Sequence, residues 1–427
     1  MSKADFNLLW RKICFIGALA LVALAAYRVG VESVDGFYYA DEANYCYYAG
    51  FFKSYVGHHF DNVVLRSELR YQAVPVGLYW IAATIYFSKY NYMLQEPSKV
   101  WLALPNLPDK RSPMNNFILQ HPFPYIKKMI YVLRERMLIY RALTCVLIFI
   151  IAWYLGGYRG AGLTVALLLF NPSFVEETGL VLIESIWLFQ HFLNIIIIYY
   201  YFKYRSEHKP NLFYSSILAG LIGVTAGLLI ATKINGFLNL FVFLMSYIVI
   251  WMKSDQQDRV DLRSSKVAFL HIFIVFFLAA AVFYFMDPAL YGHPIAGAKE
   301  IIMQRLKLTE MQVNNDPSSL LTDPWRRLMY INKAKINLID CFFVLIGIGW
   351  AIKRFISAGN KQWGYLYTIV LISFFIFLTS ILVFMKMGQK RYLLVLDCYL
   401  FIFESLGFWL ILGNLFKRLR ASCSLRN

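Results

Sequence analysis

Two adjacent carboxylates, Asp41 and Glu42, follow the first long apolar run of the chain and stand among tyrosines. A lone carboxylate is costly to bury in low dielectric, so such groups are usually paired, hydrated or catalytic. Two adjacent acids can take different roles in general-base catalysis: one accepts a proton, and the other orients the first acid or holds a cation. The alternative is a hydrated interfacial loop within an aromatic belt. The pair by itself is compatible with both interpretations.

A third carboxylate, Glu184, stands among apolar residues at the start of a later apolar run. Acids at membrane depth are rare and are usually functional or paired, so we predict one of these roles for Glu184. Gln190 and His191 lie further along the same run. For both we expect a hydrogen-bonded role in the protein core.

Several basic residues border the apolar runs and could bind a substrate phosphate. Arginine binds phosphate through two parallel hydrogen bonds, and lysine supplies a point charge. For each residue the alternative is snorkelling, with the charged end reaching the membrane surface. The candidates are Arg66, Arg70, Lys233, Lys386, Lys390 and Arg391.

No resident metal site is predicted from the spacing of the possible ligands. His58-His59 lacks the spacing of known zinc motifs, and the six cysteines are scattered, mostly inside apolar runs. A divalent ion held by the acids near Asp41 is left open.

The composition indicates a polytopic α-helical membrane protein. Of the 427 residues, 59% are hydrophobic and 16% are charged, whereas ordinary soluble domains carry about 25% charged residues. The apolar runs are continuous, which excludes the alternating pattern of a β-barrel. The net charge of +17 has two interpretations: a positive-inside bias with attraction to anionic lipids, or binding of a phosphate-bearing lipid substrate. No basic stretch resembles a nucleic-acid-binding arm.

The apolar runs predict about ten spans within one domain, 1–427, with both termini in the cytoplasm. The first span is an uncleaved helix, and Ser216 to Trp251 is divided at Lys233 because one helix of that length, about 54 Å, is too long for one crossing. Two long outer loops, 32–136 and 287–337, are expected. Within the first, Val76 to Ser88 is too short to span and is predicted to be an interfacial or re-entrant helix. The predicted spans are 13–31, 137–155, 161–170, 183–202, the two parts of 216–251, 267–286, 339–352, 365–384 and 392–415.

The order of these features resembles the GT-C superfamily of polyprenyl-phosphate-sugar-dependent glycosyltransferases. The resemblance is to the group that contains the protein O-mannosyltransferases and the lipid A aminoarabinose transferases. It extends over most of the chain. The matching segments are Asp41-Glu42 with Tyr45, then Val74 to Trp80, Arg141 to Gly157, Gly162 to Pro172, Gly220 to Lys233, and Lys390 to Leu394.

The resemblance implies a GT-C-like fold and an inverting glycosyltransferase acting on the periplasmic or luminal face. The donor is expected to be a polyprenyl-phosphate-linked sugar, and the acceptor a glycan, a lipid or a protein. Asp41 is expected to be the general base, with Glu42 and Glu184 orienting it or the acceptor. The cations listed above would bind the donor phosphate. The residues expected to line the sugar or acceptor site are Tyr45, Tyr79, Trp80, Tyr291 and His293.

This chain departs from the group at three positions. Glu184 stands where an aspartate is usual, Gly179 stands in the place of an arginine, and Ala73 stands where the aminoarabinose transferases have a lysine. Arg70 or Arg66 would therefore have to replace that lysine. The identities of the donor sugar and of the acceptor therefore cannot be inferred from either relative.

Two other classes of function are open on the sequence. A lipid-glycan flippase would have internal repeats and paired broken helices, and only the break at Lys233 is visible. A glycan polymerase or ligase would use a basic late outer loop and would not need Asp41. The location expected for the chain is a bacterial inner membrane, with the endoplasmic reticulum as the alternative.

Overall fold

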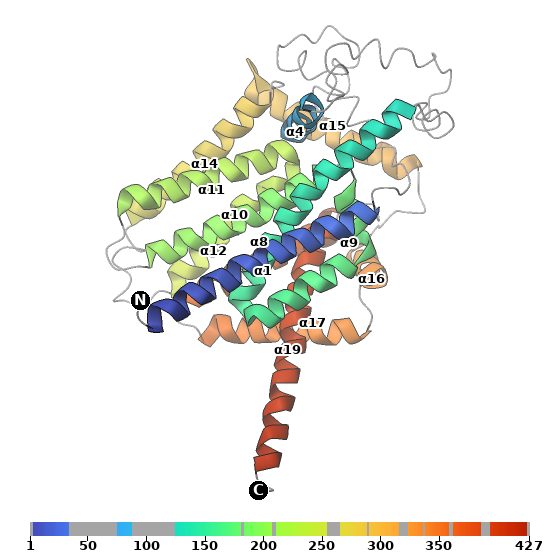
Figure 1. Cartoon of the computed structure of the whole chain (residues 1–427). Helices are drawn as coiled ribbons and strands as arrows, with labels where there is room; N and C mark the ends of the chain where they lie inside the picture. The colour runs from blue at the N-terminus through green and yellow to red at the C-terminus, as the bar shows by residue number, and fades with distance from the viewer. Residues whose placement is uncertain are drawn as a thin grey trace.

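The computed structural model describes residues 3–33, 75–87, 124–180, 183–206, 211–253, 265–287, 290–315, 323–335, 338–357, 362–385 and 393–424. Within these ranges every regular element is a helix, which confirms the all-α class predicted from composition (Figure 1). The elements are α1 (Lys3–Ser33), α4 (Pro75–Tyr86), α8 (Pro124–Phe170), α9 (Pro172–Gly179), α10 (Ile183–Arg205), α11 (Leu212–Thr232), η2 (Ile234–Phe237), α12 (Leu238–Lys253), α14 (Ser265–Met286), α15 (Pro294–Asn315), α16 (Pro324–Lys335), α17 (Leu338–Ser357), α18 (Gln362–Phe384) and α19 (Leu394–Ser424).

Eight helices among the described residues are long and apolar enough to cross a membrane. One of them, Ile130–Phe170, has 41 residues, about 62 Å at 1.5 Å per residue, which is twice the thickness of a hydrocarbon core. The chain reverses at Gly157, whose φ of 73° is readily adopted only by glycine. Beyond the reversal, Thr178 accepts a 2.8 Å hydrogen bond from Arg141, which precedes it. The turn at Gly157, between the predicted spans 137–155 and 161–170, therefore closes a helical hairpin (Figure 1).

The count of about ten spans stays a prediction. It requires the α8 hairpin to cross the membrane twice. It also requires a crossing by α17, which carries Asp340 near its start and Lys353 and Arg354 near its end.

The helices define two ends of the bundle, which we call the α4 end and the Gly157 end. The α4 end contains the start of α10, the end of α11 and the end of α14. There Gly77 of α4 packs so closely on Ile183 that an added Cβ would lie 2.3 Å from its Cγ2 atom. The Gly157 end contains the ends of α12 and α17, joined by a 2.5 Å hydrogen bond from Lys253 Nζ to the carbonyl of Phe355.

The predicted short helix and the predicted helix break are both present. The twelve residues of α4 are too few to span a bilayer, as expected for Val76 to Ser88. The division of Ser216 to Trp251 occurs at Lys233, which separates α11 from the short η2 helix and α12.

The structure adds two helices and lengthens two others. The segment 287–337 contains α15 and α16, which were not foreseen because neither has a continuous apolar run. Helix α8 begins at Pro124, before the span predicted from Met137; the span predicted at 392–415 agrees with the apolar part of α19, Leu394–Phe416, and the helix itself continues to Ser424. In both cases polar and charged residues extend a helix beyond its apolar part. Residues 88–123 of the first predicted outer loop lie outside the described residues.

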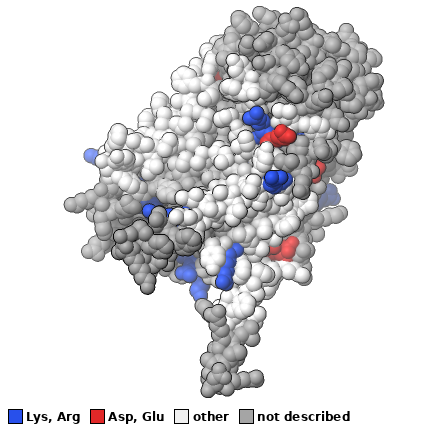
Figure 2. All heavy atoms as spheres, viewed as in Figure 1, with Lys and Arg blue, Asp and Glu red and all other residues white. Residues whose placement is uncertain are grey.

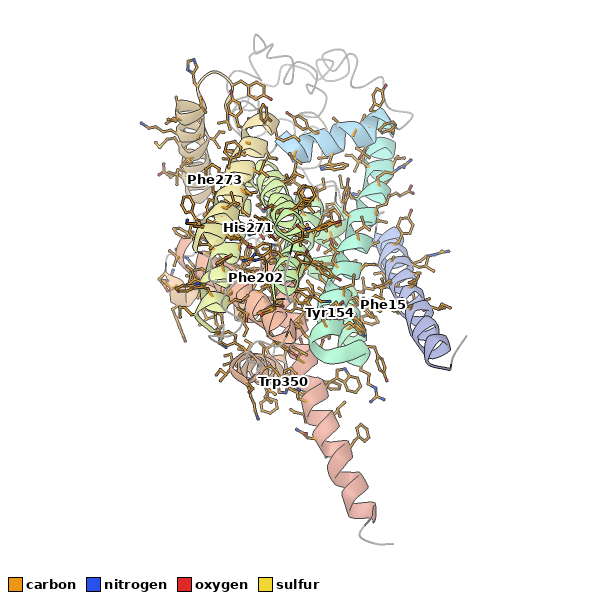
Figure 3. The ribbon with its side chains drawn as sticks, turned by 90° about the vertical axis from the view of Figure 1, so that its left-hand side faces the viewer. Phe15, Tyr154, Phe202, His271, Phe273 and Trp350 are labelled. Carbon is orange, nitrogen blue, oxygen red and sulfur yellow. The ribbon has the colours of Figure 1, made fainter. Side chains whose placement is uncertain are left out.

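Aromatic side chains and a few buried polar groups fill the interior. Figure 3 shows Phe202 and His271 in the middle of the molecule, away from Phe15 on α1. His271 of α14 bonds the hydroxyl of Tyr201 on α10 at 2.9 Å and that of Ser216 on α11 at 3.2 Å. These bonds hold α14 against its two neighbours. The described surface in Figure 2 is mostly uncharged, as expected for a lipid-facing bundle.

Helices α17 and α19 approach each other through two glycines. A Cβ built on Gly347 would lie 1.8 Å from the carbonyl oxygen of Phe403, and one on Gly407 would lie 2.0 Å from that of Phe343. Small residues that let backbones meet are typical of helix packing in membranes. By contrast, a Cβ on Gly349 or Gly413 of the same two helices would meet nothing within 4 Å.

We expect Gly347→Ala and Gly407→Ala to destabilise the protein by about 1–3 kcal/mol each, because the added methyl group forces the helices apart. Thermal unfolding in detergent measures this. Gly349→Ala and Gly413→Ala are the matched controls, and they should be neutral or slightly stabilising because alanine favours helix. Equal melting temperatures for the four variants would contradict this packing.

Candidate active site

Six of the residues predicted from the sequence to form the site lie in the described part of the chain. They are Tyr79, Trp80, Glu184, Lys233, Tyr291 and His293. The other eight lie outside the described residues, so their predicted roles stay predictions. These are Asp41, Glu42, Tyr45, Arg66, Arg70, Lys386, Lys390 and Arg391.

Glu184 and Lys233 form an ion pair at the α4 end. The Lys233 Nζ and Glu184 Oε1 atoms are 3.3 Å apart, and their side chains are 15% and 4% exposed. Glu184 lies in the first turn of α10, and Lys233 is the residue at which α11 stops. The helix break thus brings a lysine ammonium group to a carboxylate at the boundary of the apolar bundle. The structure confirms that Glu184 is paired.

The ring of Trp187 lies beneath the lysine. Lys233 Nζ is 5.6 Å from the centroid of this ring, within the range of a cation–π interaction. Trp187 follows Glu184 by three positions on α10, so both side chains project from the same side of the helix. One face of α10 therefore supplies both the carboxylate and the aromatic ring that hold the ammonium group.

A hydrogen-bonded network continues from Trp187 into the core. Trp187 stacks on His191 with the ring centroids 5.8 Å apart. The two nitrogens of His191 bond Asn239 of α12 at 2.9 Å and Tyr399 of α19 at 2.8 Å. Tyr399 in turn bonds Ser373 of α18 at 2.6 Å. Four helices are joined beneath the ion pair.

The expectation of hydrogen-bonded core roles for His191 and Gln190 is confirmed. Gln190 accepts a 2.8 Å hydrogen bond from Thr232, the last residue of α11. Because Lys233 follows Thr232 directly, this bond also fixes the point at which the lysine leaves the helix.

Helix α4 covers this end of the bundle, and Tyr79 attaches it to α14. The Tyr79 hydroxyl donates a 2.9 Å hydrogen bond to the carbonyl of Met286. Burial, followed by the neighbouring Asp287 and Tyr291, raises the pKa of Tyr79 above its ordinary value. Burial also raises the pKa of Tyr291, followed by the neighbouring Tyr284 and Asp287. Tyr79 and Tyr291 therefore both lie near the carboxylate of Asp287.

Asp287 is fully buried and was not among the site residues predicted from the sequence. The sequence pattern that pointed to Glu184, an acid at the edge of an apolar run, could also have identified Asp287. Asp397, in the first turn of α19 and 1% exposed, carries the same signal. It lies near Tyr330 of α16, whose pKa is raised by burial and then by Glu177 and Asp397.

Two predicted sugar-binding residues are not brought to the ion pair. Trp80 is 44% exposed and packs its edge on Tyr140 of α8, with 5.8 Å between the ring centroids. His293 is exposed where α15 begins. Within the described part of the chain, neither contacts Glu184 or Lys233. Trp80 points away from the side of α4 that carries Tyr79, because consecutive side chains on a helix point about 100° apart.

The arrangement suits recognition of an anion by a lysine and of hydroxyl or amine groups by buried carboxylates. Among the residues that the structure describes, no group of three or more histidines, cysteines, aspartates or glutamates could hold a metal ion. The Asp41–Glu42 pair lies outside those residues.

The chain is similar to known membrane glycosyltransferases in sequence and in structure. Residues 112–289 match the family model described as dolichyl-phosphate-mannose-protein mannosyltransferase. This range includes Glu184, Lys233, the Trp187–His191 stack and Asp287. No curated protein matches the chain in sequence.

Solved structures of the oligosaccharyltransferase AglB from Archaeoglobus fulgidus are similar to this chain. The complex of AglB with an inhibitory peptide and a dolichol-phosphate matches with a TM-score of 0.52 at 13% identity, over 97% of this chain and 52% of that one. The apo form of the same enzyme matches with a TM-score of 0.55 at 12% identity, over 97% and 52%. A form tethered to an acceptor peptide matches with a TM-score of 0.53 at 12% identity, over 95% and 50%.

The chain spans about half the length of these oligosaccharyltransferases. At such low identity the similarity establishes the fold. The resemblance inferred from the sequence is confirmed at that level: the chain has the fold of the GT-C superfamily of membrane glycosyltransferases.

Proposed function

We propose that the protein is a glycosyltransferase that moves a sugar from a polyprenyl-phosphate carrier to an acceptor at the α4 end of the bundle. The GT-C fold and the mannosyltransferase match over residues 112–289 support the reaction class. The observation that carries the proposal is the ion pair of Lys233 and Glu184, held at 3.3 Å over Trp187 at the boundary of an apolar bundle. A lipid phosphate and its sugar would meet the protein at this depth.

The reaction needs a base on one side of the anomeric carbon and a cation on the other. In the proposed step, Asp41 takes the proton from an acceptor hydroxyl or amine while the acceptor atom bonds the anomeric carbon. The bond from that carbon to the phosphate oxygen breaks, and polyprenyl phosphate leaves with the electron pair. Because attack and departure occur on opposite faces, the configuration of the sugar inverts.

Lys233 is proposed to stabilise the departing phosphate, together with the predicted cations Arg70, Lys386 and Arg391. A preorganised charge in a site that excludes water is worth far more than the same charge in solution. Glu184 would then hold the ammonium group in place before the donor arrives. Tyr79 and Tyr291, which both lie near Asp287, are proposed to contact the sugar.

The charges at the two ends of the bundle support an orientation. Lysine or arginine lies in the last turn of α10, α12 and α17 at the Gly157 end, in Lys203, Arg205, Lys253 and Arg354. At the α4 end, acids lie in the first turn of α10 and of α19, in Glu184 and Asp397. Under the positive-inside rule the Gly157 end faces the cytoplasm. The α4 end would face the periplasm of a bacterium, or the lumen if the membrane is that of the endoplasmic reticulum.

The molecules bound in the solved structures indicate which classes of donor and acceptor should be tested with this protein. One AglB structure holds a dolichol-phosphate and an inhibitory peptide, and another is tethered to an acceptor peptide. For this chain we propose a polyprenyl-phosphate sugar as donor. The acceptor is proposed to be a glycan, a lipid or a protein.

We expect Asp41→Asn to lower the transfer rate by about 10²–10⁴-fold, the usual contribution of a general base. The purified variant and the wild type are compared with a polyprenyl-phosphate sugar in detergent, after a melting curve shows that both are folded. Release of polyprenyl phosphate is followed together with labelling of the acceptor. Transfer at the wild-type rate by the folded variant would rule out this base. Transport of the lipid without any transfer would point to a flippase.

We expect Lys233→Ala to raise the KM for the lipid donor by at least about tenfold, because a charge-assisted contact to phosphate is worth about 1.5–3 kcal/mol. Lys203→Ala is the matched control. That lysine also lies over an aromatic ring, 5.8 Å from the centroid of Tyr200, but at the opposite end of α10. Equal effects of the two changes on the donor KM would contradict the assignment of Lys233.

The double variant Lys233→Ala with Glu184→Gln separates binding from stability. Removing the lysine alone leaves a buried carboxylate without its cation, which costs about 3–5 kcal/mol when a buried pair is broken. The double variant removes most of that cost. It should melt at a higher temperature than Lys233→Ala and still bind the donor weakly.

A further inference from the structure

Helix α15 exposes a continuous apolar stripe. Ile295, Ile302 and Leu306 are 86%, 53% and 50% exposed, and their spacing of seven and four positions places them along one side of the helix. Met303, also 53% exposed, adjoins them. The opposite side is the one that packs on the protein, through Ile301, which is 1% exposed. Helix α15 is thus anchored by one face and turns an apolar face away from the bundle.

The anchor places α15 at the end of a lipid-facing span. Leu290 and Ile301 pack against Phe283 and Tyr284 in the last turns of α14. Of the described residues in the α14 span, only 17% are buried. Phe285, at its very end, is 69% exposed. The surface that α14 presents to lipid therefore continues directly to the start of α15.

The direction and charge of α15 fit a helix lying in the membrane surface. Figure 1 shows α15 running across the α4 end of the bundle, at a large angle to α14 and α11. Lys299 and Lys307 are exposed, and Lys299 lies between Ile295 and Ile302 on the apolar side. A lysine within such a stripe can extend its charge to lipid headgroups while its methylene groups stay among apolar neighbours.

We propose that α15 is an interfacial helix: its apolar stripe inserts among the lipids of the leaflet at the α4 end, and Lys299 binds the phosphates of anionic headgroups. The partner is the bilayer itself, because the stripe is continuous with the lipid-facing surface of α14. This inference does not depend on the proposed reaction.

A spin label at single positions of the full-length protein in phosphatidylethanolamine–phosphatidylglycerol nanodiscs tests the proposal. A ketone-bearing unnatural amino acid carries the label, so the native cysteines stay in place. Positions 302 and 306 report on the stripe. Position 307 is the matched control, because it is exposed but about 100° around the helix from 306.

The label at 302 and 306 should collide more often with oxygen and less often with a water-soluble nickel chelate than the label at 307. Substitution of Lys299 by glutamate should move position 302 towards water in anionic nanodiscs. Two results would overturn the proposal. One is equal nickel accessibility at 302, 306 and 307. The other is an immobile label at 302 and 306 shielded from both reagents, which would mean that a protein partner or a second copy covers the stripe.

Discussion

The geometry of the α4 end depends on a lysine and a glutamate removed from water together. Glu184 is 4% exposed and Lys233 15% exposed, with 3.3 Å between their charged atoms. A buried pair is seldom more stable than well-packed apolar residues, yet losing one partner is costly. The pair therefore fixes geometry more than it adds stability. It sets where α11 ends, where α10 begins and which side of α10 faces the break.

The remaining contacts keep this pair from moving independently of the bundle. Trp187 lies under the ammonium group and stacks on His191, whose two nitrogens are bonded to α12 and α19. Above the pair, Tyr79 attaches α4 to the end of α14. A shift of Lys233 would therefore disturb contacts in helices far apart in the sequence. This coupling would give the proposed site the preorganised charge that electrostatic catalysis requires.

Hydropathy could predict the membrane class, the short α4 helix and the break at Lys233, because each follows from local runs of residues. The contact between Lys233 and Glu184 could not be predicted in this way, since it joins positions 49 apart and depends on helix packing. Helices α15 and α16 were missed because amphipathic faces leave no continuous apolar run. Asp287 was missed although it carries the same signal as Glu184. The roles of Asp41 and Glu42 still rest on the sequence resemblance.

The charges at the α4 end favour a helix break that carries a lysine. Acids lie in the first turns of α10 and α19, where the positive ends of the helix dipoles favour them. The side chain of Glu184 is only 4% exposed, and a carboxylate buried to this extent needs a nearby cation. A cation inside an apolar helix would be costly, but a break at the boundary lets Lys233 pair with Glu184 while its side chain stays 15% exposed. The interruption of α11 thus brings an ammonium group to the first turn of α10.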